Sequence, residues 1–164
     1  MIILGIDPGT TATGYAVLDC AVSKPVLLES GLLRAPRDSA QARLTGIHDS
    51  LTSIIRKWRP SSLAVEKLYF EKNKKTAMAV SETRGIILLT AAIQKITLSE
   101  YSPLEVKKAV TGYGRAEKPA VEKIIRFSVA GAESMNAKDD VFDAIAIAFT
   151  DHLLGKFRSR QNTK

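Results

Sequence analysis

Four acidic residues lie along the 164-residue chain in positions where they could bind a divalent metal ion together. Asp7 follows an apolar run, residues 2–6, and Glu66 ends a second one, while Asp140 and Asp143 are three residues apart in a helical stretch. An ionised carboxylate at the end of a buried strand is costly unless a partner compensates its charge. A shared cation site therefore explains all four acids, and carboxylates that bind Mg²⁺ are suited to hydrolysis of a phosphodiester.

Each acid taken alone also has an ordinary structural explanation. Asp7 precedes Pro8 and Gly9 and is a typical turn residue, and the pair Asp139-Asp140 could cap the N-terminus of a helix. All four together are harder to explain in this way. Because Asp140 and Asp143 are at positions i and i+3, they project from the same face of their helix, which favours one shared site.

The charge of the chain suits a polyanionic partner. The formal net charge is +7, and residues 54–75 contain seven basic residues against two acids. The segment 156–164 adds further lysines and arginines and no acid. A basic chain that carries a few metal-binding acids is the pattern expected of a nuclease. The basic side chains hold the phosphate backbone, and the bound cations neutralise the cleavage site.

The hydrophobic pattern predicts a mixed α/β sheet. Helices are predicted over 39–58, 73–95, 103–110, 117–129 and 138–153, and strands over 2–7, 15–18, 26–34, 63–66 and 97–101. Short connections make the first three strands antiparallel, whereas a helical crossover makes the fourth strand parallel to the first. The fifth strand adds a second parallel member. Asp7 and Glu66 should then be neighbours at the carboxyl ends of two adjacent strands.

One domain is expected over residues 1–155, followed by a disordered basic tail, 156–164. No apolar run approaches the ~20 residues that span a bilayer, and the N-terminus lacks the features of a signal peptide. The single cysteine, Cys20, cannot form an internal disulfide. These features favour a cytoplasmic protein. Residues 86–93 are apolar nearly all round, so we expect their helix to be buried on a second side by another subunit.

The chain also resembles a known family, the bacterial RuvC Holliday junction resolvases, over residues 2 to about 153. The residues that carry the resemblance are Ile3-Leu4-Gly5-Ile6-Asp7-Pro8-Gly9, Gly14-Tyr15, Ala64-Val65-Glu66, Lys72-Asn73, Arg84-Gly85, Ala116-Glu117-Lys118 and the run from Asp140 to Ala148. The resemblance implies a ribonuclease H-like fold and a homodimer. It further implies paired, symmetric nicking of four-way DNA junctions in homologous recombination and repair, with two Mg²⁺ ions per active site and Mn²⁺ as a substitute.

The resemblance also assigns roles to individual residues. It makes Asp7, Glu66, Asp140 and Asp143 the metal-binding catalytic residues. It places Lys107 and Lys118 at basic, DNA-binding positions near the active site, and Tyr69 where an aromatic side chain stacks on junction bases. A branch-migration helicase complex is the further partner that it implies.

Three departures from the family pattern leave alternatives open. The run 67–71 leaves either Tyr69 or Phe70 as the stacking residue, and Thr10-Thr11 removes one basic group. Asp139 is an extra acid beside Asp140, so the choice between them rests on the i, i+3 spacing.

Other functions were also compatible with parts of the sequence. An actin-like or sugar-kinase-type phosphate binder explains residues 6–11 but lacks the helical acid pair, and it usually needs two such lobes. A ribonuclease H-fold nuclease acting on another nucleic acid, or a non-catalytic DNA-binding module, are the remaining alternatives. The last leaves the four acids unexplained, because acids repel phosphate unless metal intervenes.

Overall fold

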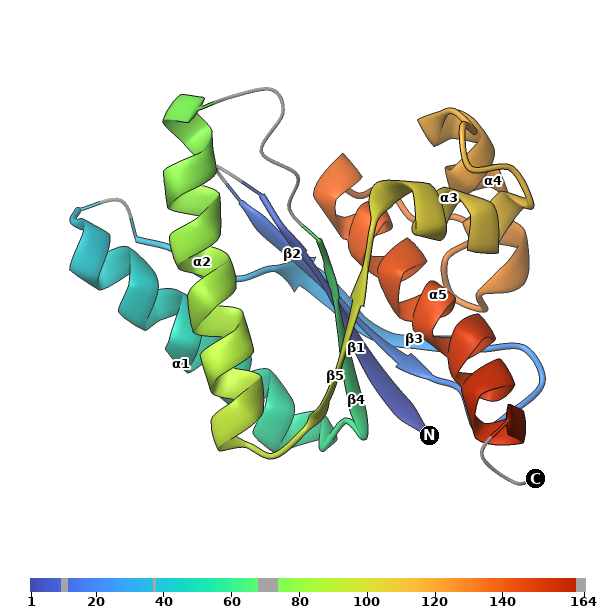
Figure 1. Ribbon diagram of the computed structural model, residues 1–164, viewed down its shortest axis with the longest axis horizontal. Helices are drawn as coiled ribbons and strands as arrows, with labels where there is room; N and C mark the ends of the chain where they lie inside the picture. Colours follow the sequence, from blue (N-terminus) through green and yellow to red (C-terminus); the bar gives the residue numbers. More distant parts are fainter. Residues whose placement is uncertain (10–11, 37, 68–73, 162–164) are drawn as a thin grey trace.

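The computed structural model describes residues 1–9, 12–36, 38–67 and 74–161 (Figure 1). In chain order the elements are β1 (Ile2–Pro8), β2 (Thr13–Asp19), β3 (Val26–Leu32), α1 (Ala40–Trp58), β4 (Ser62–Glu66), α2 (Lys74–Ile93), β5 (Thr97–Tyr101), α3 (Pro103–Thr111), α4 (Lys118–Ser128) and α5 (Asp139–Gln161). The order and type of these elements agree with the sequence prediction. Among the described residues, no helix is long and apolar enough to cross a membrane.

The sheet has five strands in the order β3-β2-β1-β4-β5. β1 pairs antiparallel with β2, and β2 pairs antiparallel with β3, whereas β4 is parallel to both β1 and β5. The three-plus-two mixed sheet is therefore confirmed. In the β1–β4 register Ile6 lies opposite Val65. The next residue along each strand is an acid, Asp7 or Glu66, so the pairing places these two residues side by side, as predicted.

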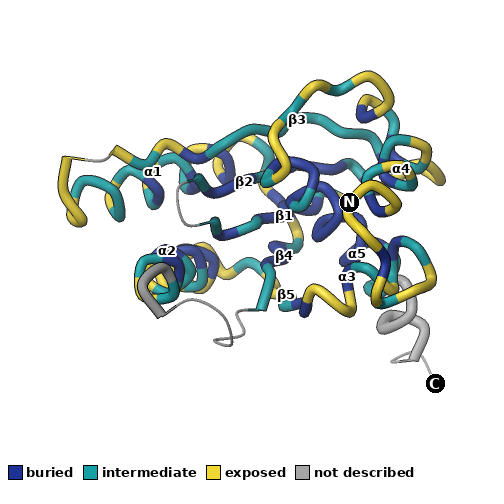
Figure 2. The backbone as a smooth tube through the Cα atoms, turned by 90° about the horizontal axis from the view of Figure 1, so that it is seen from above, coloured by how far each residue is buried: buried dark blue, intermediate teal, exposed yellow. Residues whose placement is uncertain are grey.

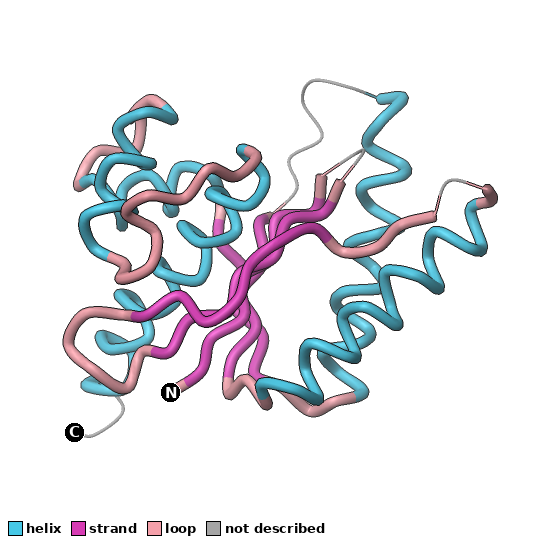
Figure 3. Tube along the Cα trace, turned by 180° about the vertical axis from the view of Figure 1, so that it is seen from behind, coloured by secondary structure: helices cyan, strands magenta, loops and turns pink. Residues whose placement is uncertain are grey.

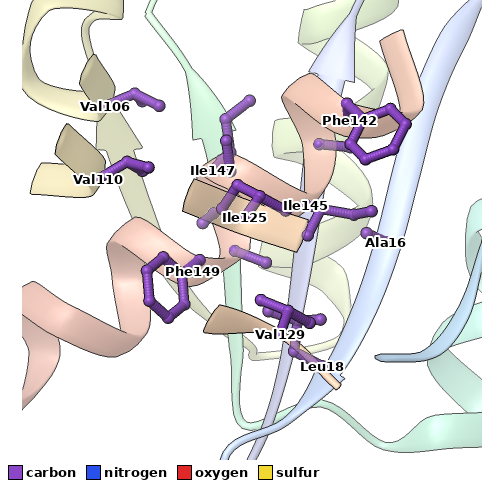
Figure 4. Packing of buried hydrophobic residues seen from close by; sticks show 14 of the residues in the cluster. Ala16, Leu18, Val106, Val110, Ile125, Val129, Phe142, Ile145, Ile147 and Phe149 are labelled. Atoms are coloured by element: carbon purple, nitrogen blue, oxygen red, sulfur yellow. The ribbon is translucent and has the colours of Figure 1, made fainter. Parts of the chain in front are cut away.

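Helices cover both faces of the sheet (Figures 1 and 3). α1 and α2 lie together on one face, and their apolar residues share a buried cluster with β1 and β4 that includes Leu4, Leu51 and Ile87. α5 lies on the other face, with α3 and α4 outside it. Ile145 and Ile147 of α5, Ile125 of α4 and strand residues such as Leu18 share a second buried cluster there (Figure 4). The buried residues accordingly concentrate in the central strands and the helix sides that face them (Figure 2).

Local signals in the sequence determine where the helices begin and end. Ser39 caps α1 by accepting a hydrogen bond from the Ala42 amide, and α1 ends at Trp58, with Arg59 as its C-cap just before Pro60. α3 begins with a reciprocal capping box between Ser102 and Glu105. The capping box fixes the start of the helix that directly follows β5 and carries Lys107.

The last helix is longer than the sequence pattern indicates. α5 continues to Gln161, whereas the sequence pattern predicts its end at 153. Gly155 weakens a helix without ending it, and no proline follows to stop the chain. Leu153 and Leu154 pack against the buried cluster between α5 and the sheet. This packing also supports the helix beyond its predicted end. Residues 162–164 lie outside the described part of the chain.

Candidate functional site

Two of the predicted acids stand at the carboxyl ends of adjacent central strands. Asp7 is the second-last residue of β1, and Glu66 is the final residue of β4. Both side chains are partly buried, while the residues before them are fully buried. The Glu66 backbone is held on one side by Arg84 of α2, whose Nε donates to the Glu66 carbonyl oxygen at 3.4 Å. Arg84 also forms an ion pair with Glu100 of β5.

Two glycines allow α5 to lie directly on the sheet and deliver the other two acids. A Cβ on Gly5 would lie 2.2 Å from the backbone oxygen of Ala144 and 2.7 Å from the Ala148 nitrogen. A Cβ on Gly14 would lie 2.0 Å from the backbone oxygen of Asp140. Neither side chain could be accommodated without moving the helix. The glycines therefore bring the first turn of α5 against β1 and β2, where Asp140 and Asp143 join Asp7.

The pKa values show that the four acids act on one another. Burial raises the pKa of Asp7 to about 8, and the negative charges of Glu66, Asp143 and Asp140 add to this increase, with Lys118 opposing it. Burial also raises the pKa of Glu66 to about 7, with a further increase from Asp143 and opposition from Lys118 and Lys107. Acids that hold their protons near neutral pH are typical of functional sites.

A lysine lies among these acids. The Lys118 ammonium donates a hydrogen bond to Asp143 Oδ2 at 2.7 Å and lies 3.6 Å from Asp139 Oδ2. Burial lowers the pKa of Lys118, but the hydrogen bond to Asp143 and the charges of Asp143, Asp139 and Asp7 outweigh it, so the net shift is upward. Lys118 is the first residue of α4, where the helix dipole disfavours a cation. The acids compensate for that penalty.

The donor set of this site suits a hard divalent cation, because it consists of carboxylate oxygens that repel one another. Among the described residues, no group of three or more histidines, cysteines or acids is already gathered closely enough to bind one ion. Asp143 is engaged by Lys118 in this arrangement. Binding of a cation by all four acids would therefore require their side chains to turn inward and Lys118 to leave Asp143.

The remaining predicted site residues have different outcomes. Lys107 of α3 lies close enough to Glu66 for its charge to lower the pKa of that carboxyl. Asp139 is an outlying acid, since 83% of its side chain is exposed. Tyr69 and Phe70, the two candidates for base stacking, lie outside the described residues, as do Thr10 and Thr11. Which aromatic residue stacks on DNA stays a prediction.

Sequence reasoning missed the residues that position the acids. Gly5 and Gly14 were noted as parts of the family motif, but their contacts with α5 were not predicted. The available signal was the match between Gly5 and the small residues Ala144 and Ala148 of the last helix, whereas Gly14 meets the backbone of Asp140 and Val141, which no small side chain marks. Arg84 was likewise noted only as part of a motif.

Comparison with known proteins identifies the family. The model of the family described as "Crossover junction endodeoxyribonuclease RuvC" matches residues 3–151. The chain belongs to the RuvC family. It is similar to the RuvC of Heliobacterium modesticaldum, with 44% identity over 149 residues that cover 90% of this chain and 91% of the relative. The RuvC of Moorella thermoacetica is 40% identical over 162 residues, covering 98% of this chain and 96% of the relative.

Solved RuvC structures show the same fold. Thermus thermophilus RuvC superposes with a TM-score of 0.88 at 28% identity, covering 96% of this chain and 97% of the other. A second structure, T. thermophilus RuvC in complex with a Holliday junction substrate, gives a TM-score of 0.87 at 28% identity, with 97% of each chain covered. The ribonuclease H-like α/β fold implied by the sequence resemblance is thus confirmed. Among the functions considered, membership of the RuvC family favours the crossover junction endonuclease, a hydrolase.

Proposed function

We propose that this RuvC-family protein resolves four-way DNA junctions by paired, symmetric nicks in homologous recombination and repair. The observation that carries the proposal is the cluster of Asp7, Glu66, Asp140 and Asp143, which three separate elements bring into mutual electrostatic contact. A purely DNA-binding role would not explain why a basic chain gathers acids whose pKa values are raised. The complex of T. thermophilus RuvC with a Holliday junction supports the same substrate class.

The four carboxylates would hold the divalent ions, since they supply the hard oxygen ligands that Mg²⁺ prefers. A pair of bound Mg²⁺ ions, with Mn²⁺ as a substitute, would supply an activated water and stabilise the leaving 3′-oxygen. Asp7 and Glu66 must release their protons to serve as ligands, so their raised pKa values tie ligand formation to pH. Lys118, once released from Asp143, would bind a phosphate near the scissile bond, and its present contact with Asp143 supports this role.

A homodimer would supply the two active sites that paired nicking requires. α2 exposes apolar side chains on the side away from its buried face: 71% of Met78, 55% of Leu89 and 60% of Ile93 are accessible in the single chain. Ile87 on the opposite side of the helix is fully buried. An exposed apolar stripe along one helix suits an isologous contact with a second copy of the same helix.

Two further parts of the assignment rest on the composition of the sequence: a single nuclease domain over 1–155 and a cytoplasmic location. Delivery of the junction by a branch-migration helicase complex rests on the family resemblance. The base-stacking role of Tyr69 rests on the same ground. Tyr69→Ala should impair junction cleavage and barely affect binding to linear duplex, because stacking contributes about 1–3 kcal/mol per base and needs an unpaired base. Equal losses on both substrates would point to Phe70 instead.

Cleavage of a synthetic mobile four-way junction tests the proposal. With Mg²⁺, nicks should appear at symmetry-related positions on two opposing strands, and linear duplex, single strands and RNA–DNA hybrid should remain intact. Nicks in the hybrid but not in the junction would favour a ribonuclease H-fold enzyme with another substrate. An absence of cleavage of any nucleic acid with Mg²⁺ or Mn²⁺ would reject the proposal.

Substitutions then test the site itself. Asp7→Asn, Glu66→Gln, Asp140→Asn and Asp143→Asn should each nearly abolish cleavage and leave junction binding intact, because each removes a metal ligand. Asp139→Asn is the matched control, since its exposed carboxylate is outside the cluster, and it should keep most activity. Normal cleavage by any of the first four variants would remove that residue from the site.

A further inference from the structure

A buried carboxylate ties α5 to the opposite half of the sheet. Asp151 lies in α5, well beyond the proposed metal ligands, and only 6% of it is accessible to solvent. Its Oδ1 accepts a hydrogen bond from the Tyr101 hydroxyl at 2.6 Å, and its Oδ2 accepts one from the Ser62 hydroxyl at 2.5 Å. Tyr101 belongs to β5 and Ser62 to β4, so the carboxylate joins three elements. Hydroxyl donors to a carboxylate are among the stronger hydrogen bonds in proteins.

Tyr101 also contacts the backbone next to the metal site. It is fully buried and lies opposite Glu66 in the β4–β5 register. Its carbonyl oxygen accepts a hydrogen bond from the amide of Lys67, the residue after Glu66, at 2.7 Å. One tyrosine therefore contacts the end of the Glu66 strand through its backbone and α5 through its side chain.

The glycine contacts and the Asp151 contacts restrain α5 in different directions. Gly5 and Gly14 determine how closely α5 approaches β1 and β2. Asp151 instead links α5 to β4 and β5, the side of the sheet that carries Glu66. The relative position of Glu66 and of the acids on α5 depends on this second restraint, because they come from separate elements.

We propose that Tyr101, Asp151 and Ser62 form a positioning brace that sets the spacing between Glu66 and the Asp140/Asp143 pair, and with it the affinity for divalent ions. The proposal rests on the metal site assigned above. None of the three residues is one of the proposed metal ligands. Loss of the brace should therefore weaken ion binding without removing a ligand. Partners that orient ligands directly are worth about 10–100-fold in metal affinity, so a more distant brace should be worth about 3- to 10-fold.

Tyr101→Phe and Asp151→Asn test the brace in the full-length protein. Metal affinity is read directly from the free Mn²⁺ signal in electron paramagnetic resonance without DNA, and again from the Mg²⁺ concentration for half-maximal junction cleavage. The Mn²⁺ dissociation constant and the Mg²⁺ concentration for half-maximal cleavage should both rise about 3- to 10-fold, with cleavage at saturating Mg²⁺ within about threefold of the parent protein. The two substitutions combined should cost less than the sum of their separate effects, because both act on the contact between Tyr101 and Asp151.

Tyr15→Phe is the matched control. It also removes a tyrosine hydrogen bond to a carboxylate, since the Tyr15 hydroxyl donates to Glu29 at 2.8 Å, but it leaves the brace untouched. It should lower thermal stability with no change in Mn²⁺ affinity. If Asp151→Asn fails to fold, Ser62→Ala replaces it, because it removes the second hydrogen bond of the same carboxylate.

The outcomes separate the brace from the metal site on which it rests. Brace variants that lose stability but bind Mn²⁺ as tightly as the parent would overturn the brace and show that Asp151 only supports the fold. The metal site itself is judged on the parent protein and on Glu66→Gln. If the parent binds Mn²⁺ no better than Glu66→Gln, the assignment of the ligands fails and the brace fails with it.

Discussion

Replacing Gly14 by alanine tests most directly how α5 delivers its acids. A Cβ at position 14 would lie 2.0 Å from the backbone oxygen of Asp140, whereas ordinary contact begins at 3.4 Å. The first turn of α5 must therefore move away from β2 by about 1.4 Å, because both colliding groups are backbone or backbone-attached and neither can rotate away. Asp140 and Asp143 would move with it.

The expected effect on the rate is large and the effect on folding moderate. A misplacement of about 1 Å at a reacting centre costs on the order of 100-fold, so Gly14→Ala should slow cleavage by about that factor. Overpacking typically costs about 1–3 kcal/mol of stability, which should leave the protein folded at assay temperature. The assay is single-turnover cleavage of a four-way junction at saturating Mg²⁺, with junction binding measured without metal.

Gly31→Ala is the control for an alanine in a strand of the same sheet. Its Cβ would meet only the flexible Tyr15 side chain, with the nearest atom at 3.3 Å. It should cleave at nearly the parent rate. A folded Gly14→Ala protein that cleaves within about threefold of the parent would refute the reasoning, because α5 would then not be positioned by its close contact with the sheet.

Three further predictions follow from charges and exposed surfaces. The raised pKa values of Asp7 and Glu66 mean that the folded protein binds protons more tightly than the unfolded chain. The free energy of unfolding of the metal-free protein should therefore fall between about pH 5 and pH 8 in urea titrations. Asp7→Asn should reduce that fall, and excess Mg²⁺ should reverse it; a flat profile in the parent would contradict the pKa shifts. Leu89→Lys should convert a dimer into monomers in sedimentation at micromolar concentration, while Phe127→Lys on the exposed surface of α4 should not. A parent protein that sediments only as a monomer would remove the α2 dimer. Lys118→Gln should slow cleavage and lower the salt dependence of junction binding by about one unit of slope; unchanged values would place Lys118 away from phosphate.

Much of the fold could be predicted because the relevant signals are local. Helix α1 begins at a serine cap and ends before Pro60, and α3 begins with a capping box, all legible in the sequence. The parallel pairing of β1 and β4 follows from the helical crossover between them, and this pairing makes Asp7 and Glu66 neighbours. The length of α5 was underestimated, because its support by packing is not a local signal.

The residues that position the site were not predictable in the same way. The hydrogen bonds to Asp151 link residues 50 and 89 positions apart in the chain. In the sequence Asp151 is one polar residue among many. The hydrogen bond from Lys118 to Asp143 joins residues on two different helices, and no spacing rule connects them.

By itself, the sequence determined the order of elements and the adjacency of Asp7 and Glu66 at the ends of parallel strands, and it singled out the four candidate acids. These depend on side-chain periodicity, capping and connection rules, which act over a few residues or follow from topology. Only the tertiary structure decided how close α5 lies to the sheet. It also decided that the Lys118 ammonium lies among the acids and that the buried Asp151 carboxylate links α5 to β4 and β5. Those properties depend on distances between segments far apart in the chain, and such distances arise only when the packed elements settle against one another.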